Sequence, residues 1–176
     1  MKREQKTKIR RAAGMTLSLV AATTLFAAAA QPSQAAAGYS FVNKGASVKM
    51  GDKAATFIKK AGKVKSGPKK VSSCAYKGYD ITRIYKNFKL VTYTNSKKKN
   101  ATEYVQQITF LNKKAKTKEG IHIGSSKSAV LKAYKKARVN KTGILYTATK
   151  GKTKLLIQMS GKGANSTVKK VMYIKK

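Results

Sequence analysis

Acidic residues are scarce in this chain, which has five Asp and Glu against 40 Lys and Arg, and cysteine, histidine and tryptophan are nearly absent. Because Cys74 is the only cysteine, an intramolecular disulfide and a cysteine-rich metal site are excluded. His122 is the only histidine, and the few carboxylates are widely separated, so the usual nucleophile relays and carboxylate pairs cannot be assembled. We therefore expect no catalytic residue, no cofactor and no metal site, and predict that the protein is not an enzyme.

The first 37 residues are arranged in the way that is typical of a secretory signal peptide. A basic start, MKREQKTKIRR, precedes an uncharged run over 15–30 and small residues suited to cleavage after Ala35 or Ala37. The uncharged run is shorter than the roughly 20 residues that span a bilayer, and no second such run follows. We predict a secreted, extracellular protein with no transmembrane segment in its mature chain. An uncleaved membrane anchor is the alternative.

The predicted mature chain, residues 38–176, is strongly basic. Six of the 40 basic residues and one of the five acids precede residue 38, which leaves 34 cations, four acids and a net charge of +30. Only Arg83 and Arg138 among these cations are arginines. A field of this size attracts polyanions. Lysine acts as a point charge, so its dominance favours diffuse, salt-sensitive association over base-specific recognition.

Two segments of the chain share one pattern. KGASVKMGDKAATFIKKAGK and KEGIHIGSSKSAVLKAYKK each contain a short alternating run, a glycine and then an apolar stripe at helical spacing, and the two glycines, Gly51 and Gly124, are 73 residues apart. Asp52 in the first copy and Ser125 or Ser126 in the second are expected N-caps. The alternating runs, ASVKM and GIHI, predict a short strand before each helix.

After each stripe the pattern changes to period two, which is typical of strands. The predicted strands cover 79–85, 88–94, 103–111, 143–149, 154–160 and 167–174, and GKVKSGPKKVSSC is interpreted as a loop. We predict an α+β fold of two tandem repeats, residues 38–114 and 115–176. Each repeat would be a short strand, one helix and a three-stranded antiparallel meander, and the two would share a sheet or core. The residues expected in the core are Phe57, Ile58, Val130 and Leu131, beneath strands that carry Ile108, Phe110, Val171 and Tyr173.

Several stretches carry a resemblance. SCAYKGYD, FKLVTY, YVQQITF and TKEGIHIGSSKSAVLKAY resemble a pattern of tandem-repeat secreted proteins and lipoproteins of gut clostridia, over about residues 45–134. The duplicated order of turn, helix and β meander is also similar to that of the β-lactamase inhibitory protein and the small outer-membrane assembly lipoproteins. The resemblance implies a scaffold whose sheet faces a partner protein or the cell envelope. This chain differs from the inhibitor in its single cysteine and its positive charge, and no inhibitory residue is carried over.

Two loops, NSKKKN and NKKAKTK, concentrate lysine and contain no large apolar residue, so neither is expected to contribute to the core. The residues that we predict to bind a polyanion are Lys97, Lys98, Lys99, Lys113, Lys114, Lys116 and Lys118. The favoured function is a secreted, highly cationic, non-enzymatic binding module that associates electrostatically with anionic cell-envelope or extracellular polymers. Its partner would be teichoic acid, an acidic glycan, extracellular nucleic acid or an acidic protein surface, and cell-wall attachment would follow. The alternatives are an inhibitor or interaction partner of an exported enzyme, and a cationic antimicrobial protein.

Overall fold

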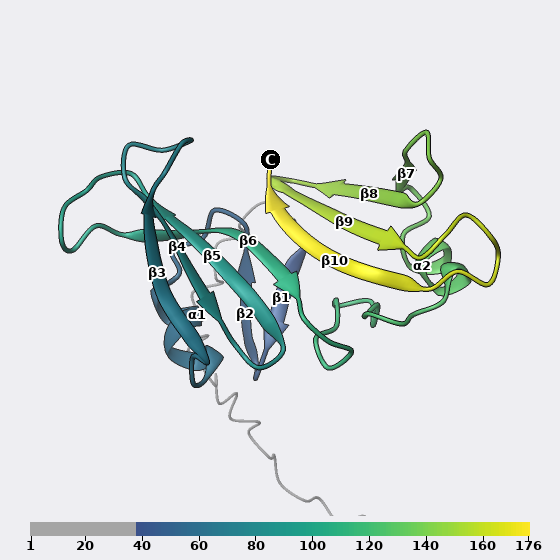
Figure 1. The fold of residues 1–176 in the computed structure, drawn as a ribbon, viewed down its shortest axis with the longest axis horizontal. Helices are drawn as coiled ribbons and strands as arrows, with labels where there is room; N and C mark the ends of the chain where they lie inside the picture. The colour runs from purple at the N-terminus through teal and green to yellow at the C-terminus, as the bar shows by residue number, and fades with distance from the viewer. Residues whose placement is uncertain (1–37) are drawn as a thin grey trace, which may run out of the picture. The chain divides into compact units, whose positions relative to one another are not determined.

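The computed structural model describes residues 38–176, which are mostly β structure (Figure 1). The predicted signal peptide, residues 1–37, lies outside the described residues. Within them the elements are β1 (Ser40–Asn43), β2 (Ala46–Lys49), α1 (Ala55–Ala61), β3 (Ser66–Ser72), β4 (Tyr79–Ile84), β5 (Phe88–Thr94), β6 (Glu103–Phe110), α2 (Lys127–Ala133), β7 (Arg138–Val139), β8 (Leu145–Lys150), β9 (Thr153–Met159) and β10 (Val168–Lys175).

Eight strands form one antiparallel sheet in the order β3-β4-β5-β6-β10-β9-β8-β7. Two runs of sequential strands, β3 to β6 and β7 to β10, meet where β6 pairs with β10. There Met172 lies opposite Thr109 and Ile174 lies opposite Gln107. The last strand of the chain therefore lies in the middle of the sheet and not at an edge (Figure 1).

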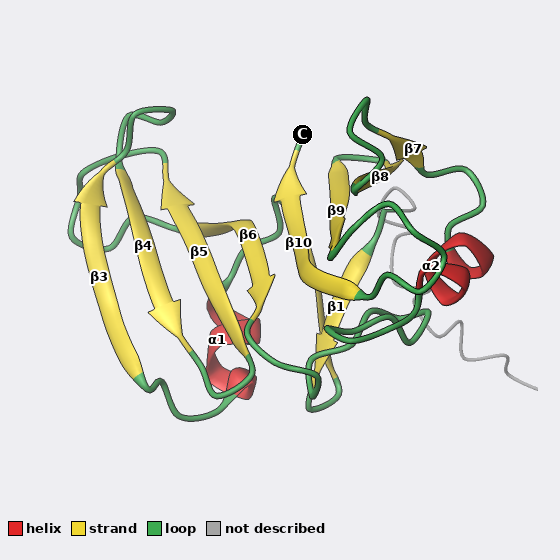
Figure 2. Ribbon diagram, turned by 45° about the vertical axis from the view of Figure 1, so that its right-hand side comes forward, coloured by secondary structure: helices red, strands yellow, loops and turns green. Residues whose placement is uncertain are grey.

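One face of the sheet is covered by the β1–β2 hairpin and the two helices (Figure 2). Phe41 of β1 is 1% exposed, and its ring packs against those of Phe57, Phe88, Phe110 and Tyr173 at centroid separations of 5.0 to 6.3 Å. The hairpin is a separate two-stranded sheet. Side-chain packing, and not a strand ladder, therefore joins it to the eight-stranded sheet.

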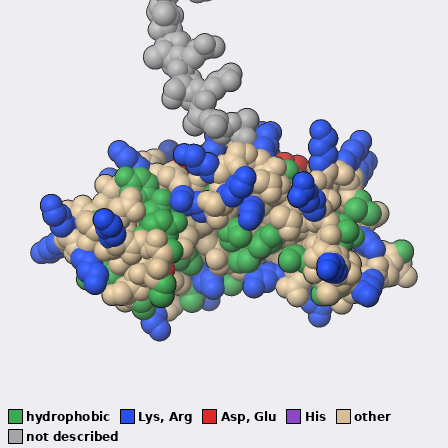
Figure 3. Space-filling view, turned by 90° about the horizontal axis from the view of Figure 1, so that it is seen from above, with side chains coloured by type: hydrophobic (Ala, Val, Ile, Leu, Met, Phe, Trp, Pro, Cys, Tyr) green, Lys and Arg blue, Asp and Glu red, His purple; other side chains and the backbone are tan. Residues whose placement is uncertain are grey.

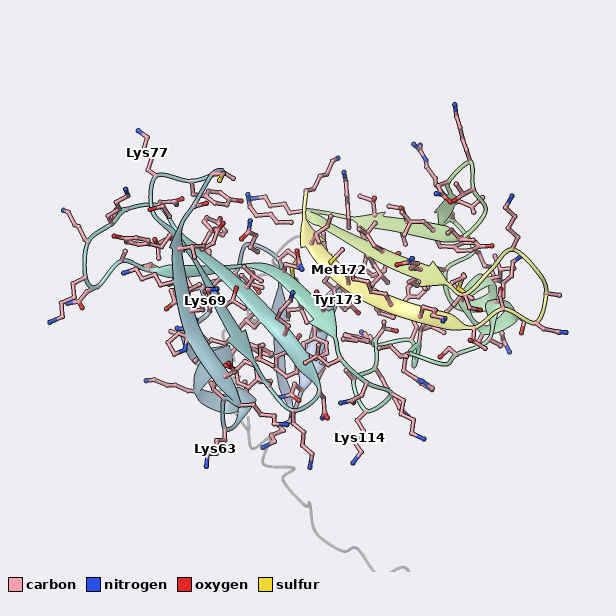
Figure 4. All side chains as sticks on the ribbon, in the orientation of Figure 1. Lys63, Lys69, Lys77, Lys114, Met172 and Tyr173 are labelled. Carbon is pink, nitrogen blue, oxygen red and sulfur yellow. The ribbon has the colours of Figure 1, made fainter. Side chains whose placement is uncertain are left out.

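The opposite face of the sheet is open. Consecutive residues of β10 show the alternation, since Tyr173 is buried in the core and Met172, on the other face, is half-buried (Figure 4). Successive side chains of a strand point to opposite faces, so the open face carries the alternate residues of each strand where its pairing is regular. Register shifts interrupt the alternation in the pairings of β3, β5 and β10. Lysine and arginine side chains of neighbouring strands can therefore lie together only where their residues point to the same face.

The predicted α+β class with two repeats of strand, helix and three-stranded meander is wrong. The described residues contain ten strands against two helices of seven residues each, and each run of the large sheet has four strands. The extra strands are β3 and β7, and residues 120–123, predicted as a short strand, form no strand. Six predicted strands are confirmed as β4, β5, β6, β8, β9 and β10.

The strand β3 lies in the segment interpreted as a loop, and its position at an edge of the sheet explains the error. All seven of its residues are exposed, so no apolar alternation marks it. It contains Pro68, and an edge strand tolerates proline because one side of its backbone has no ladder partner. Because β3 is exposed and lies at an edge, its sequence has no apolar pattern from which a strand could be predicted.

Gly51 and Gly124 each precede a helix and each join it to the large sheet. The Gly51 N–H donates to the Val105 carbonyl at 2.7 Å, and the Gly124 N–H donates to the Val168 carbonyl at 2.8 Å. Both glycines have positive φ, 89° and 95°, which other residues rarely adopt. Of the predicted N-caps, Ser126 is confirmed, since its side chain accepts from the Ala129 N–H.

Asp52 does not cap α1, where Ala54 occupies the N-cap position without a side-chain hydrogen bond. Its carboxylate instead accepts the backbone N–H of Lys49 at 2.8 Å. In the predicted core, Phe57 and Val130 are buried and Ile58 is partly buried. The burial predicted for Leu131 is wrong. Its side chain is 46% exposed, because it lies beside the apolar stripe of a helix too short to bury more than one face.

The predicted strand residues of the core are buried as expected: Ile108, Phe110, Val171 and Tyr173 are each at most 3% exposed. Cys74 is an exposed free thiol in the β3–β4 loop, although a free cysteine is more often buried.

Candidate functional site

The predicted lysine residues lie in two separate places. Lys97–Lys99 are exposed in the β5–β6 loop, and the other four are exposed in the segment that follows β6 (Figure 4 labels Lys114). These segments lie at opposite ends of β6, whose eight residues are about 25 Å long at about 3.3 Å per residue. The structure therefore does not bring the seven lysines together into one site.

The segment after β6 is anchored to the core, contrary to the prediction. Ala115 is 4% exposed and Thr117 is 5% exposed, while the lysines between and beside them point outward. The Thr117 N–H donates to the Ile121 carbonyl at 2.8 Å, and the Ile121 N–H donates to the Thr117 hydroxyl at 3.1 Å. Alternate residues of this segment, Ala115 and Thr117, point into the protein, so two small side chains are enough to hold the segment against the core.

The four carboxylates of residues 38–176 are largely engaged inside the protein. Glu103 receives a bidentate pair from Arg83 at 2.6 and 2.8 Å, and Glu119 accepts the Tyr134 hydroxyl at 2.6 Å. Asp52 accepts the backbone N–H of Lys49. One oxygen of Asp80 is buried without a hydrogen-bond partner among the described residues. Four carboxylates can balance at most four of the 34 cations in residues 38–176.

The pKa of Glu103 follows from its surroundings. Burial raises the pKa, but hydrogen bonds from Arg83 and Thr92 and the charges of Arg83 and Lys70 lower it by more, so it lies below the ordinary value. The ion pair is mostly shielded, with side chains 12% and 22% exposed. Because a bidentate, charge-assisted pair is strong, this contact is structural.

A pocket of about 510 Å³ opens where β6 and β10 diverge. The first residues of β6 pair with the segment after β2, through the Ala54 N–H and the Glu103 carbonyl at 2.8 Å, and its later residues pair with β10. Tyr93, Tyr104 and Lys175 are among the residues that line the resulting gap. The pocket is therefore built from both runs of strands.

The two tyrosines that line this pocket, Tyr93 and Tyr104, pack against each other, and Tyr93 also packs against Tyr76. The rings of Tyr76 and Tyr93 stack at a centroid separation of 3.7 Å, and Tyr104 lies 5.5 Å from Tyr93. Lys175 Nζ lies 5.4 Å and 5.5 Å from the Tyr76 and Tyr93 centroids. Burial raises the pKa of Tyr93, and the charge of Lys175 opposes this. Since neighbours occupy its ring faces, Tyr93 serves packing and offers no free face for stacking on a sugar or base.

Other chemistry is limited in this part of the chain. Within residues 38–176 no group of three or more His, Cys, Asp or Glu side chains is placed to hold a metal ion. His122 is half-buried in a turn, with Nδ1 2.8 Å from the Ile123 carbonyl oxygen. Neither helix of the described part has the length and apolar character needed to cross a bilayer.

Fold and surface together define a mostly β protein with an open sheet face and a large excess of exposed lysine. No family model, no curated protein and no solved structure matches this chain. The resemblance to the clostridial secreted proteins and to the inhibitor therefore stays a prediction.

Proposed function

We propose that this protein is a secreted, non-enzymatic binding module that holds anionic polymers of the cell envelope or the extracellular space by electrostatic attraction. The observation that carries the proposal is the imbalance of charge. Residues 38–176 have 34 cations, and their four carboxylates are largely engaged by partners inside the protein. Counter-charge for the remaining lysines must come from outside the chain.

The distribution of the lysines favours a polymer over a compact ligand. Lys and Arg side chains are spread over the whole visible face in Figure 3, while Asp and Glu show only as small spots. A long polyanion can contact many such lysines at once and release its condensed counterions, which supports binding without sequence recognition. Teichoic acid, an acidic glycan and extracellular nucleic acid all have this character, and any of them would retain the protein at the cell wall.

The test measures the affinity of the purified protein for an immobilised polyphosphate and for purified teichoic acid over a range of salt concentrations. The affinity should fall linearly on a double-logarithmic plot. Replacing Lys97–Lys99 by glutamine should flatten the slope by about 0.7 to 0.9 for each phosphate that is no longer neutralised, on the scale of nucleic acids. The matched control replaces Lys59, Lys60 and Lys135, which are also exposed.

An equal change of the salt slope in both triple variants would show that binding depends on the total charge of the surface and that the β5–β6 loop contributes no more than other segments. Affinity that does not depend on salt would contradict the proposal. On cells, a wash in about 1 M salt, where the Debye length is about 3 Å, should release the protein. A complex with an exported enzyme that survives this wash would instead favour the inhibitor alternative.

A further inference from the structure

A second cluster of cations lies on the open face of the sheet, far along the chain from the predicted loops. A groove of about 490 Å³ is lined by Lys136, Arg138, Thr147, Thr149, Lys154 and Lys176. Four of these side chains are cationic, two carry hydroxyls, and none is a carboxylate. The groove thus has only groups that donate hydrogen bonds to, or attract, an anion.

The strand register places four of these residues next to one another. Arg138 of β7 pairs with Thr147 of β8, and Thr149 pairs with Lys154 of β9. Directly opposed side chains have Cβ atoms about 5 Å apart, and residues two apart on one strand are separated by about 7 Å. Because β8 lies between β7 and β9, the four residues form a zigzag over three strands, about 10 Å across the strands and about 7 Å along them. Arg138 and Lys154 flank the two threonines on opposite sides, and both have long side chains that can reach an anion held over β8.

The alternation of β8 and β9 shows that this patch faces away from the core. Tyr146, Ala148 and Leu155, the neighbours of the groove residues, are all buried. Thr147 and Lys154 are half-exposed on the opposite face. The groove residues are therefore accessible to a ligand, and none of them is needed to fill the core.

Arg138 distinguishes this groove from the rest of the basic surface. It is one of two arginines in residues 38–176, and the other, Arg83, is occupied by Glu103. Among the described residues no ion pair or hydrogen bond engages the Arg138 side chain. A guanidinium presents a planar fork of donors that matches two oxygens of a phosphate, whereas lysine offers a point charge.

We propose that the groove is a phosphate-binding site in which Arg138 contacts two oxygens, lysine ammonium groups supply further charge, and the threonine hydroxyls donate to the remaining oxygens. The inference deepens the proposed function, on which its biological role rests, by naming a site and a ligand group. The phosphate could belong to a phosphodiester polymer or be free inorganic phosphate, since both present the same oxygens.

The experiment titrates inorganic phosphate into the isotope-labelled purified protein at constant ionic strength and follows the backbone amide resonances. Amides of β7, β8 and β9 should shift and saturate. Arg138→Gln should weaken binding at least tenfold, and Arg138→Lys, which keeps the charge, should also weaken it. The control Lys141→Gln removes one exposed charge from the nearby turn, outside the groove, and should change the dissociation constant less than twofold.

Unchanged resonances away from the groove show that each variant is folded. Should Arg138→Gln disturb the short strand β7, Lys154→Gln on β9 provides the same test. Shifts spread over all lysine-bearing segments without saturation, or an affinity that Arg138→Gln leaves unchanged, would overturn the inference.

Repeating the titration with a short poly(glycerol phosphate) separates the two sources of phosphate. Tighter saturation in the same groove would identify a phosphodiester polymer, and equal or weaker binding would identify the free anion. The outcomes also separate this inference from the proposed function. Polymer binding that depends on Lys97–Lys99 but not on Arg138 would defeat only the groove, whereas saturable phosphate binding without polymer binding would defeat only the polymer proposal.

Discussion

Replacing Phe41 by alanine should cost the fold a large part of its stability. The side chain is 1% exposed and contacts four aromatic rings that belong to α1, β5, β6 and β10. A buried Phe→Ala change costs about 3–5 kcal/mol, and we expect the upper end because ring pairs contribute about 0.5–1.5 kcal/mol beyond their buried area. A domain of ordinary stability has about 5–15 kcal/mol in total.

The β1–β2 hairpin adds to this effect, because an isolated two-stranded hairpin is marginal in water and this one has no strand ladder to the large sheet. The assay is urea denaturation followed by far-UV circular dichroism. Val42→Ala is the control, since Val42 is the next residue and is 45% exposed. It should change stability by about 0.5 kcal/mol or less.

Phe41→Leu keeps an apolar side chain at the same position and should recover a good part of the stability, which gives a measurable variant if the alanine change prevents folding. A loss below about 1 kcal/mol for Phe41→Ala, with an unchanged dependence on urea, would refute the packing described for the hairpin.

Three further outcomes are expected. Leu131→Ala should change stability by about 0.5 kcal/mol or less, as at a surface position, and Val130→Ala by several times more, in the same denaturation assay. The pKa of Glu103 is lowered in the folded protein, so the stabilisation from its pair with Arg83 is present above the ordinary pKa of 4.5 and is lost as the pH falls through the folded pKa. Glu103→Gln should therefore be less stable than the parent at pH 7, and its free energy of unfolding should fall less than that of the parent between pH 5 and pH 2. Burial, with the hydrogen bond to Glu119, raises the pKa of Tyr134. The contribution of the neutral Tyr134 side chain to stability is therefore fully present below pH 10 and is lost as the pH rises above it. Tyr134→Phe should lose less stability above pH 10 than the parent protein does. A parallel pH dependence of parent and variant would contradict either titration argument.

Part of this fold could be predicted from the sequence because some strands have one buried face. The alternation of Leu90 and its neighbours, or of Leu155 and Ile157, predicts a strand directly. The strands β3 and β7 give no such signal, since every residue of both is exposed. The strand β1 has four residues, and its one fully buried side chain, Phe41, has no periodic partner.

The helices illustrate a different limit. Apolar spacing predicted the positions of both helices correctly. Each helix has only seven residues, or two turns, and the apolar spacing did not show that the helices are this short and that strands dominate the fold. Leu131 lies one position from Val130, and the sequence places it near the edge of the apolar stripe. Which side of that edge is buried depends on what the helix packs against, and this is a tertiary property.

The candidate sites show the same division. Exposure of the loop lysines follows from local composition, since no large apolar residue competes for the core. The groove does not follow from composition, because Lys136 and Lys176 are 40 residues apart in the chain. Only the register of Arg138 with Thr147 and of Thr149 with Lys154 brings its members together. No local sequence signal could have marked the site.

The composition of charges supports the proposal that the surface is adapted to a partner and not only to solubility. A surface adapted to solubility alone mixes both signs, and added carboxylates serve that purpose better than added lysines. Here residues 38–176 have only four carboxylates against 34 cations, and two of the four, Glu103 and Glu119, hold Arg83 and Tyr134 in place. The resulting self-repulsion disfavours the compact state. Any anion that binds only the folded chain relieves this repulsion and stabilises the fold by mass action. The proposed polyanion should therefore raise the stability of the folded protein as well as retain it at the cell wall.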